Sequence, residues 1–268
     1  MRQRFHPHYR NSSLACKHIC LTVTTAAMLL LVACSTEKQP TIEKKPAPVD
    51  SAALPGREKA GASVEKPLAT TQKPSETPPE TGANWKSLFD GQSLKGWKIT
   101  DFAGHADVKV ENGSIILEQG VMTGITWSNA LPSMNYEIAL EAKRVEGSDF
   151  FCGLTFLVGT NPCSFIVGGW GGGVVGLSSL DGEDASSNET TKVAEFEKGR
   201  WYAVRLRVEP SKIQAWIDNE KYVDVDTTDK RISIRGEVEL SRPLGVASWS
   251  TTAALRNIRI REISPPSR

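Results

Sequence analysis

The sequence has no surplus of charge of either sign, and it is poor in histidine. It holds 32 Lys and Arg against 31 Asp and Glu, a formal net charge of +1. That balance gives no overall basic footprint for nucleic acid, so no nucleic-acid partner is expected. Of the 4 histidines only His105 lies beyond the first 34 residues. Metal centres and catalytic groups that need several histidines are therefore not expected.

A long hydrophobic run occurs only near the N-terminus. Residues 19–32 are apolar and follow four basic residues, Arg2, Arg4, Arg10 and Lys17. The stretch is short for a permanent membrane span and reads as a secretory signal. It ends in Leu-Val-Ala-Cys at Cys34, which resembles a bacterial lipobox. We expect residues 1–33 to be a lipoprotein signal peptide and Cys34 to carry the lipid. The alternative is an ordinary signal peptide with an incidental cysteine.

Residues 34–83 contain almost no large apolar side chain. They are rich in Pro, Lys, Glu, Ser and Thr. Such a composition cannot bury enough surface to offset the entropy of ordering the chain. We expect a disordered linker that joins the lipidated Cys34 to a folded domain at 84–263, with a short tail at 264–268. The expected location is the cell envelope, lipid-anchored in an outer membrane that faces the periplasm or the cell surface.

Cysteine is scarce in the expected domain, where only Cys152 and Cys163 remain. They flank a turn around residues 159–162. A tight turn would place Val158 opposite Cys163, so the register does not dictate a disulfide. Both a disulfide and two buried thiols remain open. A catalytic cysteine is not expected, because no histidine lies near either one.

Helical patterns are missing between residues 84 and 263, apart from a possible short turn near 194–198. Strand patterns are frequent. Asn112-Gly113 predicts a hairpin within 107–118, and Tyr136, Ile138, Leu140 and Ala142 alternate onto one face. The other expected strands cover 201–208, 213–218, 222–225 and 255–261, with three apolar central strands in 150–158, 163–170 and 173–180. Short strands and regular turns predict an all-β sandwich or jelly roll of two antiparallel sheets.

Glycine gathers in one place. Trp170 stands in a run of glycines over residues 168–173. Such a run marks a bulge, a turn or a close approach to the backbone. Trp170 is then either an exposed platform for stacking or a core residue beside a loose turn. Both interpretations remain open at this point.

The opening of the domain is the most specific motif. Trp85 and Trp97 bracket a turn at Asp90-Gly91, which predicts a pair of short strands held by aromatic burial. This pattern resembles the opening of the 3-keto-disaccharide hydrolase domain family. The motifs at 111–113, 199–202 and 255–260 resemble it as well, and 147–156, 168–176 and 180–190 resemble one branch of the family. The resemblance implies a concanavalin-A-like sandwich and a carbohydrate substrate or ligand.

The activity implied by the resemblance is cleavage of a sugar that carries a ketone at C3. The ketone acidifies the proton at C2, so a general base removes that proton and the substituent at C1 leaves. Family strands that present Asn, Glu, Gln and Asp to the concave face have apolar counterparts here, in residues 149–155 and 165–170. The expected site is therefore drier than in the wider family.

The candidate site residues gather around a loop with several carboxylates at 181–190. Loops that follow central strands commonly carry function, although an acidic loop is also a common solvated turn. Asp149, Asp181, Asp184 and Glu189 are the expected catalytic candidates. Trp170, Trp127, Asn188 and Thr126 are the expected substrate-binding residues, with Trp249 as a further stacking candidate. Asp181 and Asp184 form a weak candidate site for a divalent cation such as Ca²⁺.

Three functions fit this sequence. The first is a lyase, hydratase or hydrolase acting on 3-keto-glycosides. The second is a non-catalytic carbohydrate-binding or surface-interaction module that uses the same concave face. The third is a structural lipoprotein of the envelope. An enzyme needs two titratable groups that converge in a pocket, whereas a binding module needs exposed aromatic side chains.

Overall fold

A computed structural model describes residues 84–264 of the chain. The expected signal peptide, the lipidated Cys34, the linker and residues 265–268 lie outside the described residues. Both sheets and the hydrophobic core that joins them lie within residues 84–264, so this part has what a domain needs to fold alone.

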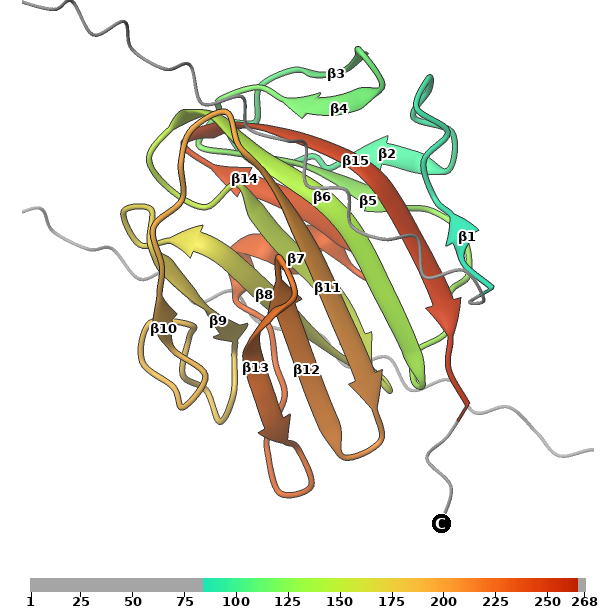
Figure 1. Ribbon diagram of the computed structural model, residues 1–268, viewed down its shortest axis with the longest axis vertical. Helices are drawn as coiled ribbons and strands as arrows, with labels where there is room; N and C mark the ends of the chain where they lie inside the picture. The colour runs from blue at the N-terminus through green and yellow to red at the C-terminus, as the bar shows by residue number, and fades with distance from the viewer. Residues whose placement is uncertain (1–83, 265–268) are drawn as a thin grey trace, which may run out of the picture. The chain divides into compact units, whose positions relative to one another are not determined.

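Two antiparallel sheets pack face to face (Figure 1). The eight-stranded sheet runs in the order β13 (Glu220–Asp226), β12 (Lys212–Ile217), β11 (Trp201–Glu209), β6 (Tyr136–Gly147), β15 (Thr251–Glu262), β4 (Ser114–Leu117) and β3 (Val108–Glu111), and β1 (Lys86–Ser87) also pairs with β15. The seven-stranded sheet runs in the order β10 (Lys192–Val193), β9 (Val174–Ser178), β8 (Asn161–Gly169), β7 (Cys152–Val158), β14 (Gly245–Trp249), β5 (Met122–Trp127) and β2 (Trp97–Ile99). The expected jelly-roll β-sandwich of two antiparallel sheets is confirmed.

The core forms where the inner faces of the sheets meet. On β6 the alternation expected from the sequence is confirmed, because Tyr136, Ile138, Leu140 and Ala142 are all buried in it. From the other sheet, Cys152, Leu154 and Phe156 of β7 and Phe165 of β8 are fully buried among them, with 0% exposure. Side chains of the other parity on the seven-stranded sheet point outward, and they form the floor of the site described below.

The hairpin predicted around Asn112-Gly113 is β3–β4, and both turn residues have the positive φ that such a turn requires (49° and 72°). The β7–β8 turn is tighter than the sequence suggested. Val158 pairs with Asn161, and Cys163 pairs with Phe156. The expected pairing of Val158 with Cys163 is therefore wrong.

Both cysteines of the domain are free thiols. Cys152 pairs with Val167 and Cys163 with Phe156, so the two thiols occupy different rungs of the β7–β8 ladder. Both side chains are fully buried. Of the two alternatives left open by the sequence, the structure has the two buried thiols.

The opening motif does not form a strand pair. β1 pairs with β15 of one sheet, and β2 pairs with β5 of the other. The turn between them connects the two sheets, and it is fixed by Asp90, whose Oδ1 accepts the N–H groups of Gln92 and Ser93. Trp97 Nε1 donates to the carbonyl of Leu88 at 2.7 Å. The motif therefore ties one sheet to the other at the entrance of the domain.

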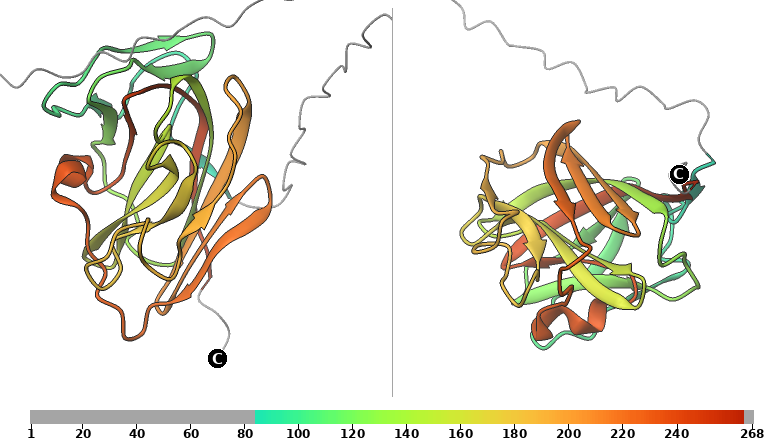
Figure 2. Two further views of the ribbon diagram at one scale, coloured as in Figure 1. Left: turned by 90° about the vertical axis from the view of Figure 1, so that its left-hand side faces the viewer. Right: turned by 90° about the horizontal axis from the view of Figure 1, so that it is seen from below.

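One short 3₁₀ helix, η1 (Gly236–Ser241), was not expected from the sequence, and the turn near 194–198 is not helical. η1 packs against β5 and β14 on the outer face of the seven-stranded sheet, away from the other sheet (Figure 2). It covers one end of that face and leaves the part over β7, β8 and β9 less covered. Within residues 84–264, no helix has the length and apolar character to cross a membrane.

Candidate functional site

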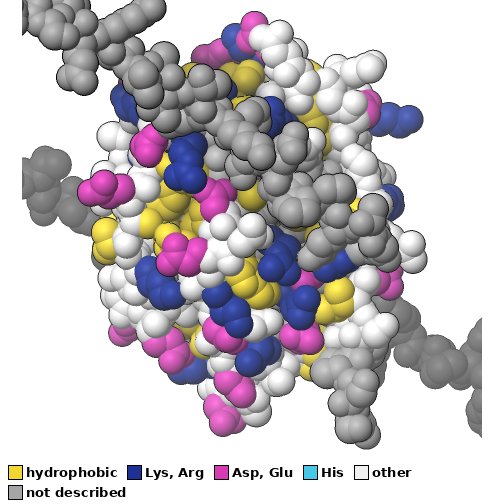
Figure 3. Space-filling model, in the orientation of Figure 1, with side chains coloured by type: hydrophobic (Ala, Val, Ile, Leu, Met, Phe, Trp, Pro, Cys, Tyr) yellow, Lys and Arg dark blue, Asp and Glu magenta, His cyan; other side chains and the backbone are white. Residues whose placement is uncertain are grey.

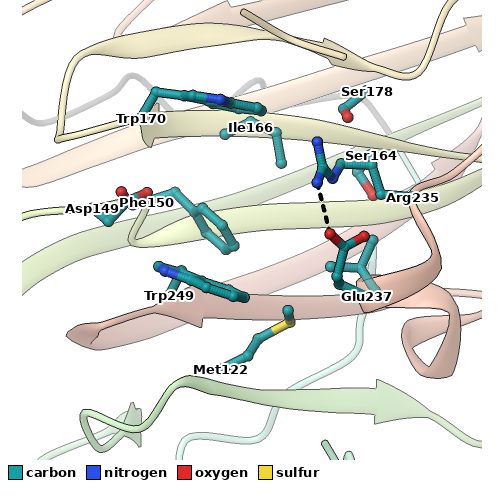
Figure 4. Close-up of a pocket in the computed structure, with 11 residues that line it drawn as sticks. Met122, Asp149, Phe150, Ser164, Ile166, Trp170, Ser178, Arg235, Glu237 and Trp249 are labelled. Carbon is teal, nitrogen blue, oxygen red and sulfur yellow. Dashed lines mark hydrogen bonds and ion pairs between the residues drawn. The ribbon is translucent and has the colours of Figure 1, made fainter. Parts of the chain in front are cut away.

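A pocket of about 240 Å³ opens on the outer face of the seven-stranded sheet, between η1 and the glycine-rich turn after β8 (Figure 4). Its walls combine apolar and aromatic side chains with a few charged and hydroxyl groups. The lining residues are Met122, Asp149, Phe150, Ser164, Ile166, Trp170, Ser178, Arg235, Glu237, Val238 and Trp249. The volume is below the ~300–1,000 Å³ common for ligand sites. The pocket is therefore of a size for one small ligand.

A row of hydroxyl groups crosses three neighbouring strands, and two of them, Ser164 and Ser178, line the pocket. Thr155 of β7 pairs with Ser164 of β8, which pairs with Ser178 of β9. The Thr155 and Ser164 hydroxyls lie 3.0 Å apart and bond to each other. Ser178 Oγ is buried and has no hydrogen-bond partner among the described residues. A buried hydroxyl without a partner is costly, so this end of the floor is suited to a polar ligand group.

Three aromatic side chains form the walls. Trp170 remains 43% exposed and lines the pocket, so of the two interpretations open at the sequence level the structure has the exposed ring. Phe150 and Trp249 stand opposite it in Figure 4. The backbone N–H of Trp249 donates to the backbone carbonyl of Phe150 at 3.0 Å. Planar rings that face a cavity bind the C–H faces of sugars by apolar contact.

Asp149 lies at the rim of the pocket and holds the turn that carries Trp170. Its Oδ2 accepts the N–H of Gly171 at 3.0 Å, and its Oδ1 accepts the N–H of Phe150 at 2.8 Å. Trp170 itself has a φ of 49°, a conformation that few L residues adopt. The carboxylate therefore stabilises an unusual backbone between its two partners.

A buried cation lies beneath the same turn. Arg144 is 6% exposed, and its Nη2 donates to the carbonyls of Asp149, Gly168 and Gly172 at 3.1, 3.2 and 2.9 Å. Burial lowers the pKa of Arg144, although the nearby charge of Asp149 partly offsets this. A Cβ at Gly168 would lie 2.6 Å from Arg144 Nη2, so the close approach requires glycine there. Arg144 thus organises the glycine-rich turn from below.

An ion-pair network closes the opposite end of the pocket. Arg235 donates from Nη1 to Asp184 Oδ2 at 2.8 Å and from Nη2 to Glu237 Oε1 at 2.6 Å. The hydrogen bond from Arg235 lowers the pKa of Glu237, which keeps Glu237 ionised and makes it a weak base. Two donors are used in these contacts, and a guanidinium has five. Arg235 can therefore also donate to a ligand oxygen in the pocket.

The carboxylates of the 181–190 loop do not line this pocket. Asp181 Oδ1 accepts the N–H of Arg231 at 2.8 Å, and its Oδ2 lies 3.4 Å from Lys230 Nζ. Glu189 pairs with the same Lys230 at 2.8 Å. Asp184 approaches the pocket only through Arg235. Of the four predicted catalytic residues, the structure brings only Asp149 into the cavity with Trp170.

The other predicted binding residues support the fold around the site. Asn188 Nδ2 donates to the carbonyls of Leu177 and Asp184 at 2.7 and 2.8 Å, which fastens the loop to β9. Thr126 is fully buried, and its hydroxyl bonds to Thr100 and to the carbonyl of Leu240 under η1. Trp127 points into the core, where its ring packs edge-on against Trp97 at 5.1 Å. None of the three reaches the cavity.

The two residues of the predicted cation site, Asp181 and Asp184, are both engaged in other contacts. Within residues 84–264, no group of three or more His, Cys, Asp and Glu side chains is placed to hold a metal ion. The Oδ1 of Asp184 accepts from Ser186, and Asp181 is engaged with Lys230 and Arg231. A Ca²⁺ site at Asp181 and Asp184 stays a prediction from the sequence. His105 lies in an exposed loop, with its Nε2 3.8 Å from Oδ1 of Asp101.

The sequence analysis did not identify three residues of the site, namely Arg144, Arg235 and Glu237. Arg144 follows the inward parity of β6, and this placement of a charge on a buried face is a signal that the sequence does contain. Arg235 and Glu237 gave no such signal, because they lie in a segment without strand or helix pattern. Only the fold brings Arg235 and Glu237 into one pocket with Ser164 of β8 and Ser178 of β9.

Fold and pocket together define a jelly-roll β-sandwich with an aromatic pocket on the outer face of one sheet. The sequence pattern of the 3-keto-alpha-glucoside-1,2-lyase-like domain matches residues 84–261, and the chain belongs to this carbohydrate-active family. The expected family is confirmed. Among curated proteins, no sequence relative matches the chain.

Solved structures with the same general architecture include proteins that bind or act on carbohydrates. A carbohydrate-binding module from Bacillus subtilis is 13% identical, with 62% of this chain and 96% of that chain covered and a TM-score of 0.43. Domain 4 of an extracellular arabinanase from Geobacillus stearothermophilus is 13% identical, with 66% and 90% covered and a TM-score of 0.44. The Crh5 transglycosylase is 11% identical, with 69% and 86% covered and a TM-score of 0.49.

Proposed function

We propose that the protein binds a single saccharide ring in the aromatic pocket and that the bound sugar is a glycoside with a ketone at C3. The observation that carries the proposal is the arrangement of Phe150, Trp170 and Trp249 around a small cavity with hydroxyl groups on its floor. Aromatic rings favour the C–H faces of a sugar, and hydroxyl and guanidinium groups bind its oxygens. Family membership supports the ketone at C3.

The chemistry assigned to the site is elimination across C1 and C2. Asp149 is the general base, because Arg235 lowers the pKa of the other lining carboxylate, Glu237, and so weakens Glu237 as a base. Asp149 takes the proton from C2, and the electron pair moves toward the ketone oxygen as an enolate. Arg235 donates to that oxygen and stabilises the developing charge. The enolate then returns to the C3 ketone, the C1–C2 double bond forms and the bond from C1 to its substituent breaks. The leaving oxygen takes up the proton that Asp149 removed from C2.

A second candidate is a non-catalytic carbohydrate-binding module that uses the same pocket. It is favoured by the pairing of Glu237 with Arg235, which leaves Asp149 as the remaining carboxylate in the lining. Elimination requires a base and an acid, and this pocket provides few groups for both.

One experiment separates the two candidates. The fragment 84–268 is incubated with 3-keto-trehalose and with 3-keto-glucosides, and the ultraviolet absorbance of the glucal product is followed while binding is measured by calorimetry. Turnover together with binding supports the enzyme. Binding without turnover supports the module. If neither 3-keto sugar binds, or if Trp170→Ala binds as tightly as the wild type, the pocket is not a saccharide site.

We propose further that Cys34 anchors the domain to a membrane through lipid, in the cell envelope. The lipobox-like sequence at residues 31–34 supports this. Stable anchoring requires more than one acyl chain, which a modified N-terminal cysteine provides. The test is labelling of the full chain with radioactive palmitate, followed by detergent phase partition. Label and detergent partition should both be lost in Cys34→Ser; label retained in that variant would contradict the anchor.

A further inference from the structure

A second groove, of about 530 Å³, lies on the opposite side of the molecule, on the outer face of the eight-stranded sheet. Its floor is low because Ala139 of β6 and Ala203 of β11 place only methyl groups there, between longer neighbours. Trp216 of β12 stands on one side, and Trp85 stands on the other, next to β15. The groove therefore crosses β11, β6 and β15 between two tryptophans.

Basic side chains are stacked on these tryptophans. Arg205 lies over the Trp216 ring with its Cζ 3.9 Å from the ring centroid, and Arg259 lies over Trp85 at 4.8 Å. Stacking uses the flat face of a guanidinium and leaves the N–H groups at its edge directed outward. Each stacked arginine is thus held in place with its hydrogen-bonding edge available.

Several donors in the groove are not used within the described part of the chain. Arg205 makes one hydrogen bond, from Nη1 to Glu137 at 3.2 Å. Arg259 Nε and Trp85 Nε1 are both buried from water and have no hydrogen-bond partner among residues 84–264. Unpaired buried N–H groups are unfavourable unless an acceptor reaches them. These N–H groups therefore lack an acceptor, whereas Glu141, a carboxylate that lines the groove, is paired with Arg256.

Charge on this face is also unbalanced. The outward sides of β6, β11 and β15 carry six basic side chains, all stacked on Trp85, Trp201 or Trp216: Lys143, Arg205, Arg207, Arg256, Arg259 and Arg261. Three carboxylates of the same strands, Glu137, Glu141 and Glu209, lie on this side as well. The balance leaves an excess of positive charge on a chain that is nearly neutral as a whole. Figure 3, which looks onto this face, shows Lys and Arg side chains gathered around patches of hydrophobic surface.

We propose that this groove binds a polysaccharide chain that carries carboxylates, such as a polyuronate. A carboxylate matches the edge of a guanidinium in two parallel hydrogen bonds, and the stacked arginines provide such edges on both sides of the groove. The alanine floor and the tryptophan walls give a sugar ring apolar surface between those charges. The site lies on the other sheet from the aromatic pocket, so it would hold an acidic glycan while the pocket remains open.

The test measures affinity of the fragment 84–268 for polygalacturonate and for the neutral polysaccharide pullulan, by affinity electrophoresis. Polygalacturonate should bind, with an affinity that falls as salt is added, and pullulan should not bind. Arg205→Gln with Arg259→Gln should weaken binding at least tenfold. Arg242→Gln, the same change at an exposed arginine beside η1, is the matched control and should bind as the wild type does. Trp170→Ala should also leave this binding unchanged.

Arg205 contacts Glu137, so the double variant could lose stability. Arg259→Gln alone avoids this, because the contact of Arg259 is with the Trp85 ring, and thermal unfolding is measured for each variant. The proposal is overturned if the folded Arg259→Gln variant and the double variant bind polygalacturonate as the wild type does. It is also overturned if pullulan binds equally well, or if vesicles of anionic phospholipid bind and polygalacturonate does not.

Discussion

The carboxylate of Asp149 accepts the backbone N–H of Gly171 at 3.0 Å and so fixes the residue that follows Trp170. This contact joins the start of β7 to the turn after β8, across 22 positions of sequence. One side chain therefore lines the pocket and also positions its exposed aromatic wall. Variants of Asp149 can separate these two roles.

Asp149→Asn removes the proposed base and keeps the size of the side chain. We expect kcat on a 3-keto-glucoside to fall by about 100-fold or more, because general base catalysis contributes that much. The dissociation constant of the sugar should change by only a few-fold, because the amide oxygen still accepts one backbone N–H. Glucal absorbance and calorimetry measure the two quantities. Asp181→Asn, outside the pocket, is the control, and an unchanged kcat in Asp149→Asn would exclude the assigned base.

Two tryptophans predicted to bind substrate should behave in opposite ways. Trp170→Ala removes a ring that is 43% exposed, so the melting temperature should stay nearly constant while sugar binding is lost. Trp127→Ala empties a place in the core beside Trp97 and should cost about 3–5 kcal/mol of unfolding free energy. Urea titration and calorimetry give the two values. Equal loss of stability in both variants would contradict the placement of Trp170 at the rim.

The sandwich was predictable because its strands alternate. Tyr136, Ile138, Leu140 and Ala142 share one parity, and that parity alone places them in the core. The hairpin at Asn112-Gly113 was predictable from the φ that those residues tolerate. Both features depend on neighbours in sequence. The opening motif was misinterpreted for the opposite reason, because its strands pair with β15 and β5, which lie far along the chain.

The site was only partly predictable, for a related reason. Trp170 and Asp149 were identified because a glycine-rich run and a strand entry are visible locally. Arg235 reaches the pocket through η1 and its preceding loop, and no local pattern predicts that packing. The contacts of the acidic loop were not predictable, because the sequence does not show which cations its carboxylates pair with. Asp181 and Glu189 share Lys230, and Asp184 holds Arg235.

The two thiols should be unreactive in the folded protein. Burial raises the pKa of Cys152 and of Cys163 to about 12, so almost no thiolate forms at neutral pH. We expect the fragment 84–268 to show no reaction with a disulfide reagent in native buffer and two reacting thiols in denaturant. A reducing agent should leave the melting temperature unchanged. Rapid reaction in native buffer, with the fold intact by circular dichroism, would contradict the burial of both groups.

Glu137 should make stability depend on acid pH. Burial alone would raise its pKa, but hydrogen bonds from Arg207 and Arg261 outweigh burial and lower it from 4.5. A carboxylate whose pKa is lower in the folded than in the unfolded protein stabilises the fold at pH values above the pKa of the unfolded state. This stabilisation is lost as the pH falls through the pKa of the folded state. Glu137→Gln should therefore lower the free energy of unfolding by about 3 kcal/mol near pH 6. The difference from wild type should shrink below about pH 4.5 in urea titrations; a difference that stays constant would show that Glu137 is not the group responsible.

Arg144 should determine whether the aromatic wall forms at all. Arg144→Met removes the donor shared by the carbonyls of Asp149, Gly168 and Gly172. We expect the free energy of unfolding to fall by about 3 kcal/mol, because buried acceptors are left unpaired. Arg144→Lys keeps the charge, but an ammonium cannot match the planar fork of a guanidinium, so sugar binding should fall here too. Arg242→Met, at an exposed ion pair, is the matched control and should cost less than about 1 kcal/mol. Calorimetry with the sugar and urea titration measure both effects. If Arg144→Lys binds sugar as the wild type does, Arg144 supplies charge alone and does not set the geometry of the turn that presents Trp170.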